Sequence, residues 1–266
     1  MPTVKIKDIE LAYSEHGDGE PLLLIGGYSM VQESWRAQVG GLAKSFRVIT
    51  FDNRGVGGTT IPDAPFTVAD LAGDAIGLMD SLGIESAFVF GVSMGGLITQ
   101  VMALDHPQRV RKAVLGCTTH GGRFAVQPAK EVMAVLGKAA DPTVPVEESV
   151  RMRLPIVFAD RFMREKPAEL EEYVRASVRN WPDPKGAAGQ FGAMSVFNVK
   201  KRLGDISCPV LVVTGDEDRM MPPENSTLLA EGIPGAELHV IAGAGHSFFI
   251  EEPEETNRVV TEFFKK

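Results

Sequence analysis

The chain has 266 residues and a mass of 28.7 kDa, enough for one large domain or for a domain that carries an insertion. Its net charge of −8 and its pI of about 5.2, without a basic run, argue against nucleic-acid binding. The apolar runs fall short of the roughly 18–20 residues that span a membrane, and the first residues lack the apolar core of a signal peptide, so we expect a cytoplasmic protein.

The spacing of apolar residues predicts strands that alternate with helices. An alternating segment at residues 4–13 suits an edge strand or hairpin, and continuous apolar runs predict strands at 22–25, 47–51, 87–92, 113–116, 209–214 and 238–241. Helical spacing predicts helices at 35–44, 68–82, 97–104 and 253–264, the second opened by a capping box from Thr67 to Asp70. Such alternation is typical of a mostly parallel sheet with helices on both faces.

Residues 120–203 break this alternation. Helical patterns continue there, no segment has the character of a strand, and seven prolines divide the segment into short lengths. We therefore expect a helical cap (120–203) inserted in a core formed by residues 1–119 and 204–266. Phe158 and Trp181 of the cap and Phe248 of the core are our candidates for the wall of an apolar substrate pocket.

Residues 91–95 form the pattern G-x-S-x-G between a predicted strand and a predicted helix. A serine at such a turn is raised to the edge of the sheet, but its own backbone dihedrals are strained. Glycines on both sides let the chain fold back without steric clash. The N–H of Met94 would then point at a developing oxyanion, which makes Ser93 the predicted nucleophile.

A serine hydroxyl also needs a base beside it and a group that orients the base. Among five histidines, His246 lies in a glycine-flanked loop after the last predicted strand and is our preferred base, with His120 as the alternative. Asp218 follows the 209–214 strand and is the preferred acid, with Asp216 as the alternative. The resulting order is nucleophile, acid, histidine.

On these motifs the chain resembles the α/β-hydrolase superfamily over nearly its whole length, in particular the small esterases and lactonases related to 3-oxoadipate enol-lactonase. The matching segments are 52–58, 91–96, 215–218, 222–225 and 243–249. The resemblance implies an α/β-hydrolase fold, with a mostly parallel eight-stranded sheet flanked by helices and a helical cap. It also implies an oxyanion hole made by the backbone N–H groups of Tyr28 and Met94. Relatives usually have His-Gly where this chain has Gly26-Gly27, so the loop lacks the imidazole that normally ties it down.

We therefore predict a cofactor-free serine hydrolase of the carboxylesterase or lactonase class, acting on a small-molecule ester or lactone through an acyl-enzyme. Two alternatives stay open: a carbon–carbon bond hydrolase of the ring-cleavage dienoate type, and a ligand-binding receptor on the same fold. Arg123 and Arg161 are candidates for binding a substrate carboxylate, although most arginines lie at the surface. No nucleic-acid or membrane partner is expected, and a homodimer is compatible with the sequence.

No metal site is expected either, because the sequence lacks H-x-H and H-E-x-x-H patterns. The glycine-rich segment 52–59 lacks the lysine of a phosphate-binding loop, so we interpret it as structural, with Arg54 held by carbonyls or a carboxylate. Cys117 and Cys208 have no ligand or redox spacing and are interpreted as buried apolar residues. Trp35 is assigned a packing role, with a pocket wall as the alternative.

Overall fold

A computed structural model describes residues 1–266 and contains one eight-stranded sheet in the order β1-β2-β4-β3-β5-β6-β7-β8. The first two strands pair antiparallel with their neighbours, and every pair from β4 to β8 is parallel. The strands are β1 (Thr3–Ile6), β2 (Ile9–His16), β3 (Glu20–Ile25), β4 (Phe46–Phe51), β5 (Ala87–Val92), β6 (Val110–Gly116), β7 (Val210–Gly215) and β8 (Glu237–Ile241). The predicted mostly parallel sheet is confirmed.

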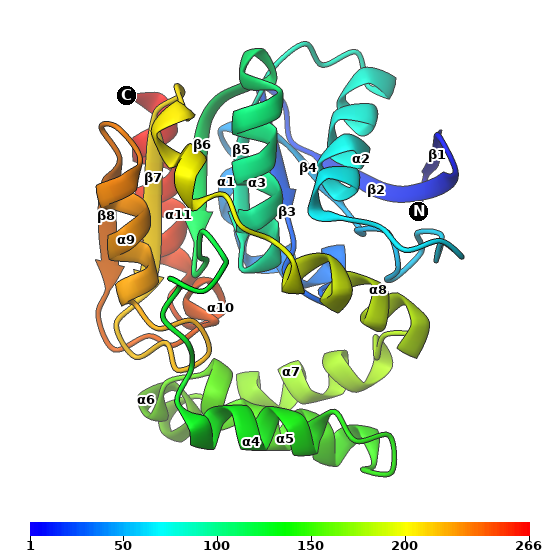
Figure 1. Ribbon diagram of the computed structural model, residues 1–266, viewed down its shortest axis with the longest axis vertical. Coiled ribbons are helices and arrows are strands. Elements are labelled where there is room, and N and C mark those ends of the chain that lie inside the picture. Colours follow the sequence, from blue (N-terminus) through cyan, green and yellow to red (C-terminus); the bar gives the residue numbers. More distant parts are fainter.

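Helices cover both faces of this sheet. Figure 1 shows α2, α3 and α9 on one face and α1 and α11 on the other. The helices of the core are α1 (Arg36–Leu42), α2 (Val68–Ser81), α3 (Met94–Asp105), α9 (Glu224–Gly232), α10 (Phe248–Glu251) and α11 (Pro253–Lys265), with 3₁₀ turns at Gln32–Trp35, Pro107–Arg109 and Lys200–Asp205. None of the chain's helices has both the length and the hydropathy needed to cross a membrane.

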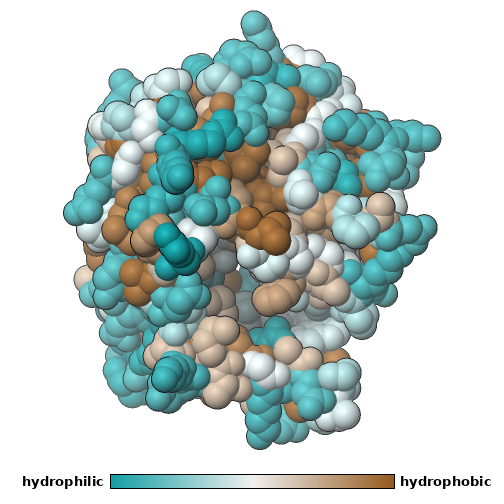
Figure 2. Space-filling model, in the orientation of Figure 1, coloured by the Kyte–Doolittle hydropathy of each residue, from teal (hydrophilic) through white to brown (hydrophobic).

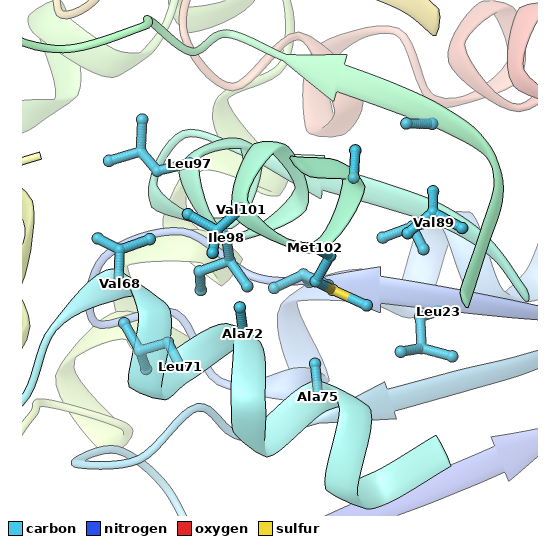
Figure 3. Packing of buried hydrophobic residues seen from close by; sticks show 14 of the residues in the cluster. Leu23, Val68, Leu71, Ala72, Ala75, Val89, Leu97, Ile98, Val101 and Met102 are labelled. Atoms are coloured by element: carbon cyan, nitrogen blue, oxygen red, sulfur yellow. The ribbon is translucent and has the colours of Figure 1, made fainter. Parts of the chain in front are cut away.

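The central strands are mostly apolar because both of their faces are buried. Along β3, Leu22 and Leu24 join one core cluster while Leu23 and Ile25 join the other, as the two-residue period of a strand requires. Figure 3 shows the cluster that contains Leu23, together with apolar side chains from α2 and α3. The two helices are thereby fixed on one face of the sheet.

The capping box predicted at the start of α2 is present. The hydroxyl of Thr67 accepts the N–H of Asp70 at 3.2 Å, and the Asp70 carboxylate accepts the N–H of Thr67 at 2.8 Å. The helix predicted at 35–44 begins differently, as a 3₁₀ turn that passes into α1 at Arg36. Trp35 lies at this junction, fully buried against Phe90 and Phe249, which is a packing position.

Residues 120–203, which we call the cap segment, contain helices and no strand beyond an isolated bridge between Gly121 and Asn198. Its helices are α4 (Lys130–Ala139), α5 (Val146–Val157), α6 (Asp160–Glu165), α7 (Pro167–Arg179) and α8 (Pro184–Ser195). Helices α4 to α7 lie beyond the carboxyl ends of the parallel strands (Figure 1). Residues of α5, α6 and α7 share a small apolar cluster separate from the two clusters of the core.

The glycine-rich loop after β4 is held by two buried acids. Asp52 accepts the N–H groups of Gln32 at 2.7 Å and of Gly58 at 2.9 Å. The guanidinium of Arg54 makes two parallel hydrogen bonds, of 2.5 and 2.6 Å, to the carboxylate of Asp74 on α2, and both side chains are almost fully buried. Arg54 is therefore tied to a carboxylate, and the loop is structural.

We expect Asp74→Asn to lower the free energy of unfolding by about 3–5 kcal/mol, because the substitution leaves the buried charge of Arg54 with only the exposed carboxylate of Asp8, 3.5 Å away. Urea denaturation measures this. The control is Asp63→Asn, which breaks the pair with Lys185 at a fully exposed carboxylate and should cost less than about 1 kcal/mol. Equal losses in the two variants would contradict the assigned role of the buried pair.

Candidate active site

Ser93 occupies the turn between β5 and α3. Its backbone φ of 54° and ψ of −118° lie in a region that residues other than glycine rarely adopt. The surroundings fix this conformation: the Ser93 N–H donates to the Gly116 carbonyl at 2.8 Å, and its own carbonyl accepts the Thr118 hydroxyl at 2.8 Å. A Cβ added to Gly95 would lie 2.0 Å from the Ile25 carbonyl oxygen, so only glycine fits there.

The loop after β3 runs directly beside this serine. A Cβ placed on Gly27 would lie 3.2 Å from the Ser93 Cβ and 3.8 Å from its Oγ. The next residue, Tyr28, has a backbone N–H without an acceptor in the protein. Met94 is the first residue of α3, so its N–H has no partner within the helix. The two N–H groups predicted to bind an oxyanion are thus both available for an acceptor near Ser93.

Three contacts hold this loop in place of the absent imidazole. Asn53 donates to the carbonyl of Gly26 at 3.1 Å, and the Gly27 N–H lies 3.4 Å from the sulfur of Met30. Gln190 of α8, fully buried, accepts the N–H of Ser29 at 2.8 Å and donates to the carbonyl of Arg54 at 3.0 Å. A helix of the cap segment therefore joins the loop after β3, which we call the oxyanion loop, to the glycine-rich loop after β4. The sequence has no signal for this link.

His246 and Asp218 meet at the same edge of the sheet. His246 Nδ1 lies 2.8 Å from Asp218 Oδ2, and both side chains are buried. The other carboxylate oxygen accepts the N–H groups of Met220 at 2.9 Å and Met221 at 2.7 Å. Because the carboxylate accepts at every contact, Nδ1 carries a proton, so in the neutral imidazole the lone pair is on Nε2.

The alternatives to these two residues lie elsewhere. Asp216 is exposed and accepts the N–H of Gly243 at 2.6 Å, a turn contact. His120 is buried with Nδ1 2.8 Å from the Gly121 carbonyl, and no carboxylate pairs with it. The structure thus brings Asp218, and not Asp216, to His246.

Cys117 links the two halves of the site. It follows β6, adjacent to both β5 and β7, and its thiol contacts the backbone of Ser93. Burial raises the pKa of this thiol well above its usual value, and the charge of Asp218 raises it further. Since Cys117 is close to both, the serine and the acid share one region of the carboxyl edge.

The three predicted pocket residues differ in their surroundings. Phe158 is buried within the cap segment, stacked on Phe162 at 5.0 Å with Tyr173 edge-on at 4.8 Å. Phe248 is fully buried in the core, and Trp181 is partly exposed. Figure 2 shows a surface hollowed between the core and the helices of the cap segment. Contact of these three residues with a substrate remains a prediction.

Residues 20–253 match a family described as alpha/beta hydrolase fold. The chain belongs to this family. A protein of Azorhizobium caulinodans that bears the name carbamate hydrolase RutD is 30% identical, over 99% of this chain and 98% of the relative. An enol-lactonase from Burkholderia xenovorans is 28% identical with a TM-score of 0.87 over the full length of both chains. A meta-cleavage product hydrolase from Pseudomonas fluorescens is 26% identical, with a TM-score of 0.86 over 100% of this chain and 97% of that one.

Glu251 is a further buried residue of this α/β-hydrolase that sequence reasoning missed. One carboxylate oxygen accepts the N–H of Gly245, next to His246, at 2.9 Å. The other accepts the N–H of Ala159, between α5 and α6, at 3.0 Å. Nearby, the Ser247 N–H donates to the Val157 carbonyl at 2.8 Å. These bonds fix the loop that carries His246, which we call the histidine loop, to the cap segment.

Burial raises the pKa of Glu251 from 4.5 to about 7, and the charges of Asp218 and Glu217 add to this effect. The folded chain holds the carboxyl proton of Glu251 more tightly than the unfolded chain does. This proton therefore contributes fully to stability below about pH 4.5, and the contribution is lost as the pH rises through 7. Relative to Glu251→Gln, the wild type should lose about 2 kcal/mol of unfolding free energy between pH 5 and pH 8. Urea denaturation of both proteins at each pH measures this, and a difference that does not change with pH would contradict it.

His, Cys, Asp and Glu side chains nowhere gather in a group of three or more that could hold a metal ion.

Proposed function

We propose that this protein is a cofactor-free serine hydrolase that cleaves a carboxylic ester or a lactone through an acyl-enzyme. The observation that carries the proposal is the strained Ser93, placed beside the two free N–H groups of Tyr28 and Met94. Strain of this kind persists only where the surrounding structure imposes it, and it is concentrated at functional sites. The pair formed by His246 and Asp218 supplies the base that a serine nucleophile needs.

In the first half of the reaction, Ser93 Oγ attacks the acyl carbon and His246 Nε2 takes its proton. The negative charge that forms on the carbonyl oxygen is bound by the N–H groups of Tyr28 and Met94. Asp218 keeps the imidazole in the reactive tautomer and stabilises the imidazolium. The proton then passes from Nε2 to the leaving alkoxide, which leaves an ester of Ser93.

In the second half, water enters in place of the alcohol. His246 removes a proton from this water as it attacks the acyl carbon, and the same two N–H groups bind the second oxyanion. Collapse of this intermediate returns the proton to Ser93 and releases the carboxylic acid. With a lactone, the alkoxide and the acid belong to one molecule, so the product is a hydroxy acid or, from an enol-lactone, an enol acid that tautomerises to a keto acid.

The relatives are consistent with this chemistry and widen the range of substrates to test. One solved structure is an enol-lactonase, and one curated relative is named a carbamate hydrolase. Esters, lactones and carbamates share an acyl carbon attached to a leaving heteroatom, so a single nucleophile and oxyanion hole serve all three. Because these proteins are 28–30% identical to this chain, lactones and carbamates should be assayed beside esters.

The second candidate is hydrolysis of a carbon–carbon bond. It is favoured by the similarity to a meta-cleavage product hydrolase, which aligns with all of this chain. Such a substrate has a ketone with a carbon leaving group, which must accept a proton before the bond breaks. Assays of a dienoate next to esters and lactones distinguish the two reactions.

We expect Ser93→Ala to leave a folded protein with no measurable hydrolysis of p-nitrophenyl esters from acetyl to dodecanoyl, because the attacking oxygen is gone. Ser81→Ala, which changes an exposed serine of α2, serves as the matched control and should keep wild-type rates. Retention of wild-type turnover by Ser93→Ala would refute the mechanism. A wild type that is stabilised thermally by an ester but hydrolyses none would instead indicate a receptor.

Asp218→Asn should lower kcat for the best of these esters by about 10⁴, because the amide favours the wrong tautomer of His246. Asp216→Asn is the matched control. It changes a carboxylate two residues away that contacts only a turn, and it should alter kcat less than about threefold. Steady-state kinetics on the two variants decide between the two aspartates, and a larger loss in Asp216→Asn would reverse the assignment.

A further inference from the structure

Arg153 of α5 differs from every other arginine of the cap segment. The others are exposed: Arg123, Arg151, Arg161, Arg164, Arg175, Arg179 and Arg202. Several of these pair with acids, as Arg151 does with Glu171 and Arg161 with Glu252. Arg153 is half-buried, with its Nε enclosed, and takes part in no ion pair. A charge in this position is costly to bury unless something neutralises it.

The guanidinium of Arg153 also keeps most of its hydrogen-bonding capacity unused. It donates once, from Nη2 to the Ala139 carbonyl at 3.1 Å, and its buried Nε has no partner. Its carbon lies 5.1 Å from the centre of the Trp181 ring, which holds the planar group in position. Burial lowers the pKa of this guanidinium, and no carboxylate counters that effect.

Arg153 is linked to the catalytic region through Trp181, which packs on the same apolar cluster as Met220, two residues after Asp218. The only ionisable groups that act on its charge are the phenols of Tyr28 and Tyr173. Tyr28 is the oxyanion-loop residue that follows Gly27, which is in contact with Ser93. Helix α5, which carries this unpaired cation, lies beyond the ends of the strands at the edge of the sheet where Ser93 starts α3 (Figure 1).

We propose that Arg153 binds a carboxylate of the substrate, so that the natural substrate is an ester or lactone that carries a second, free acid group. This inference rests on the proposed function. A planar guanidinium with free N–H groups matches a carboxylate in two parallel hydrogen bonds. The carboxylate of the ligand would pair with Arg153, for which the protein provides no carboxylate. The sequence candidates Arg123 and Arg161 are not needed for this role, because one is exposed and the other is neutralised by Glu252.

The test compares p-nitrophenyl hydrogen glutarate, which has a free carboxylate, with neutral p-nitrophenyl pentanoate, after subtraction of spontaneous hydrolysis. Arg153→Met keeps the apolar stem against Trp181 and removes the charge, and it should unfold at a temperature no lower than the wild type. We expect its KM for the acidic ester to rise about 10- to 100-fold, because a charge-assisted hydrogen bond to the substrate is lost. For the neutral ester, kcat/KM should change less than threefold. Arg123→Met is the matched control and should leave both substrates unchanged.

A second measurement does not depend on turnover. Glutarate binding to Ser93→Ala, followed by calorimetry, should weaken at least tenfold in Ser93→Ala/Arg153→Met. Equal effects of Arg153→Met on both esters, or unchanged glutarate binding, would overturn the carboxylate site even if ester hydrolysis proceeds. Glutarate binding that needs Arg153, in a wild type that cleaves neither ester, would keep this site and refute the esterase.

Discussion

The close approach of the β5–α3 turn to the end of β3 is the constraint on which the rest of the site depends. The backbone at Gly95 lies so near the Ile25 carbonyl that no Cβ fits between them. The helix must therefore start immediately after the strand, and Ser93 takes up the change of direction at a positive φ. Ser29 and Cys117, just past the ends of β3 and β6, also have positive φ values. Three strained residues at one edge show that this edge is shaped for something other than stability.

Local patterns carried most of what could be predicted. Apolar runs predicted the buried strands, because a strand covered on both faces has no polar side to show. Thr67 and Asp70 predicted the start of α2, because both partners of a capping box lie within four residues. Ser93 was recognisable because glycines are needed at fixed positions around it. Even the pairing of His246 with Asp218 follows from chain order, since both residues come after parallel strands whose carboxyl ends share an edge.

The residues that were missed act over long distances in the sequence. Gln190 bonds to Ser29, 161 positions away, and Glu251 bonds to Ala159, 92 positions away. A glutamine or glutamate on a helix has the same local sequence character whether it faces water or a backbone N–H. Arg153 was indistinguishable from its exposed neighbours for the same reason. Only the packing of α5 and α8 against the core reveals which polar side chains are enclosed.

The attachment of the cap segment has a consequence for exchanging parts between such enzymes. The segment is bonded to the histidine loop at Val157–Ala159, through Glu251 and Ser247, and to the oxyanion loop at α8, through Gln190. Helices α4 and α7 lie between or before these points. A chimera that replaces only α4 or α7 keeps the oxyanion and histidine loops anchored, whereas one that replaces the whole segment removes their supports together with the specificity it was meant to transfer. Here the unit that can be exchanged is smaller than the insertion.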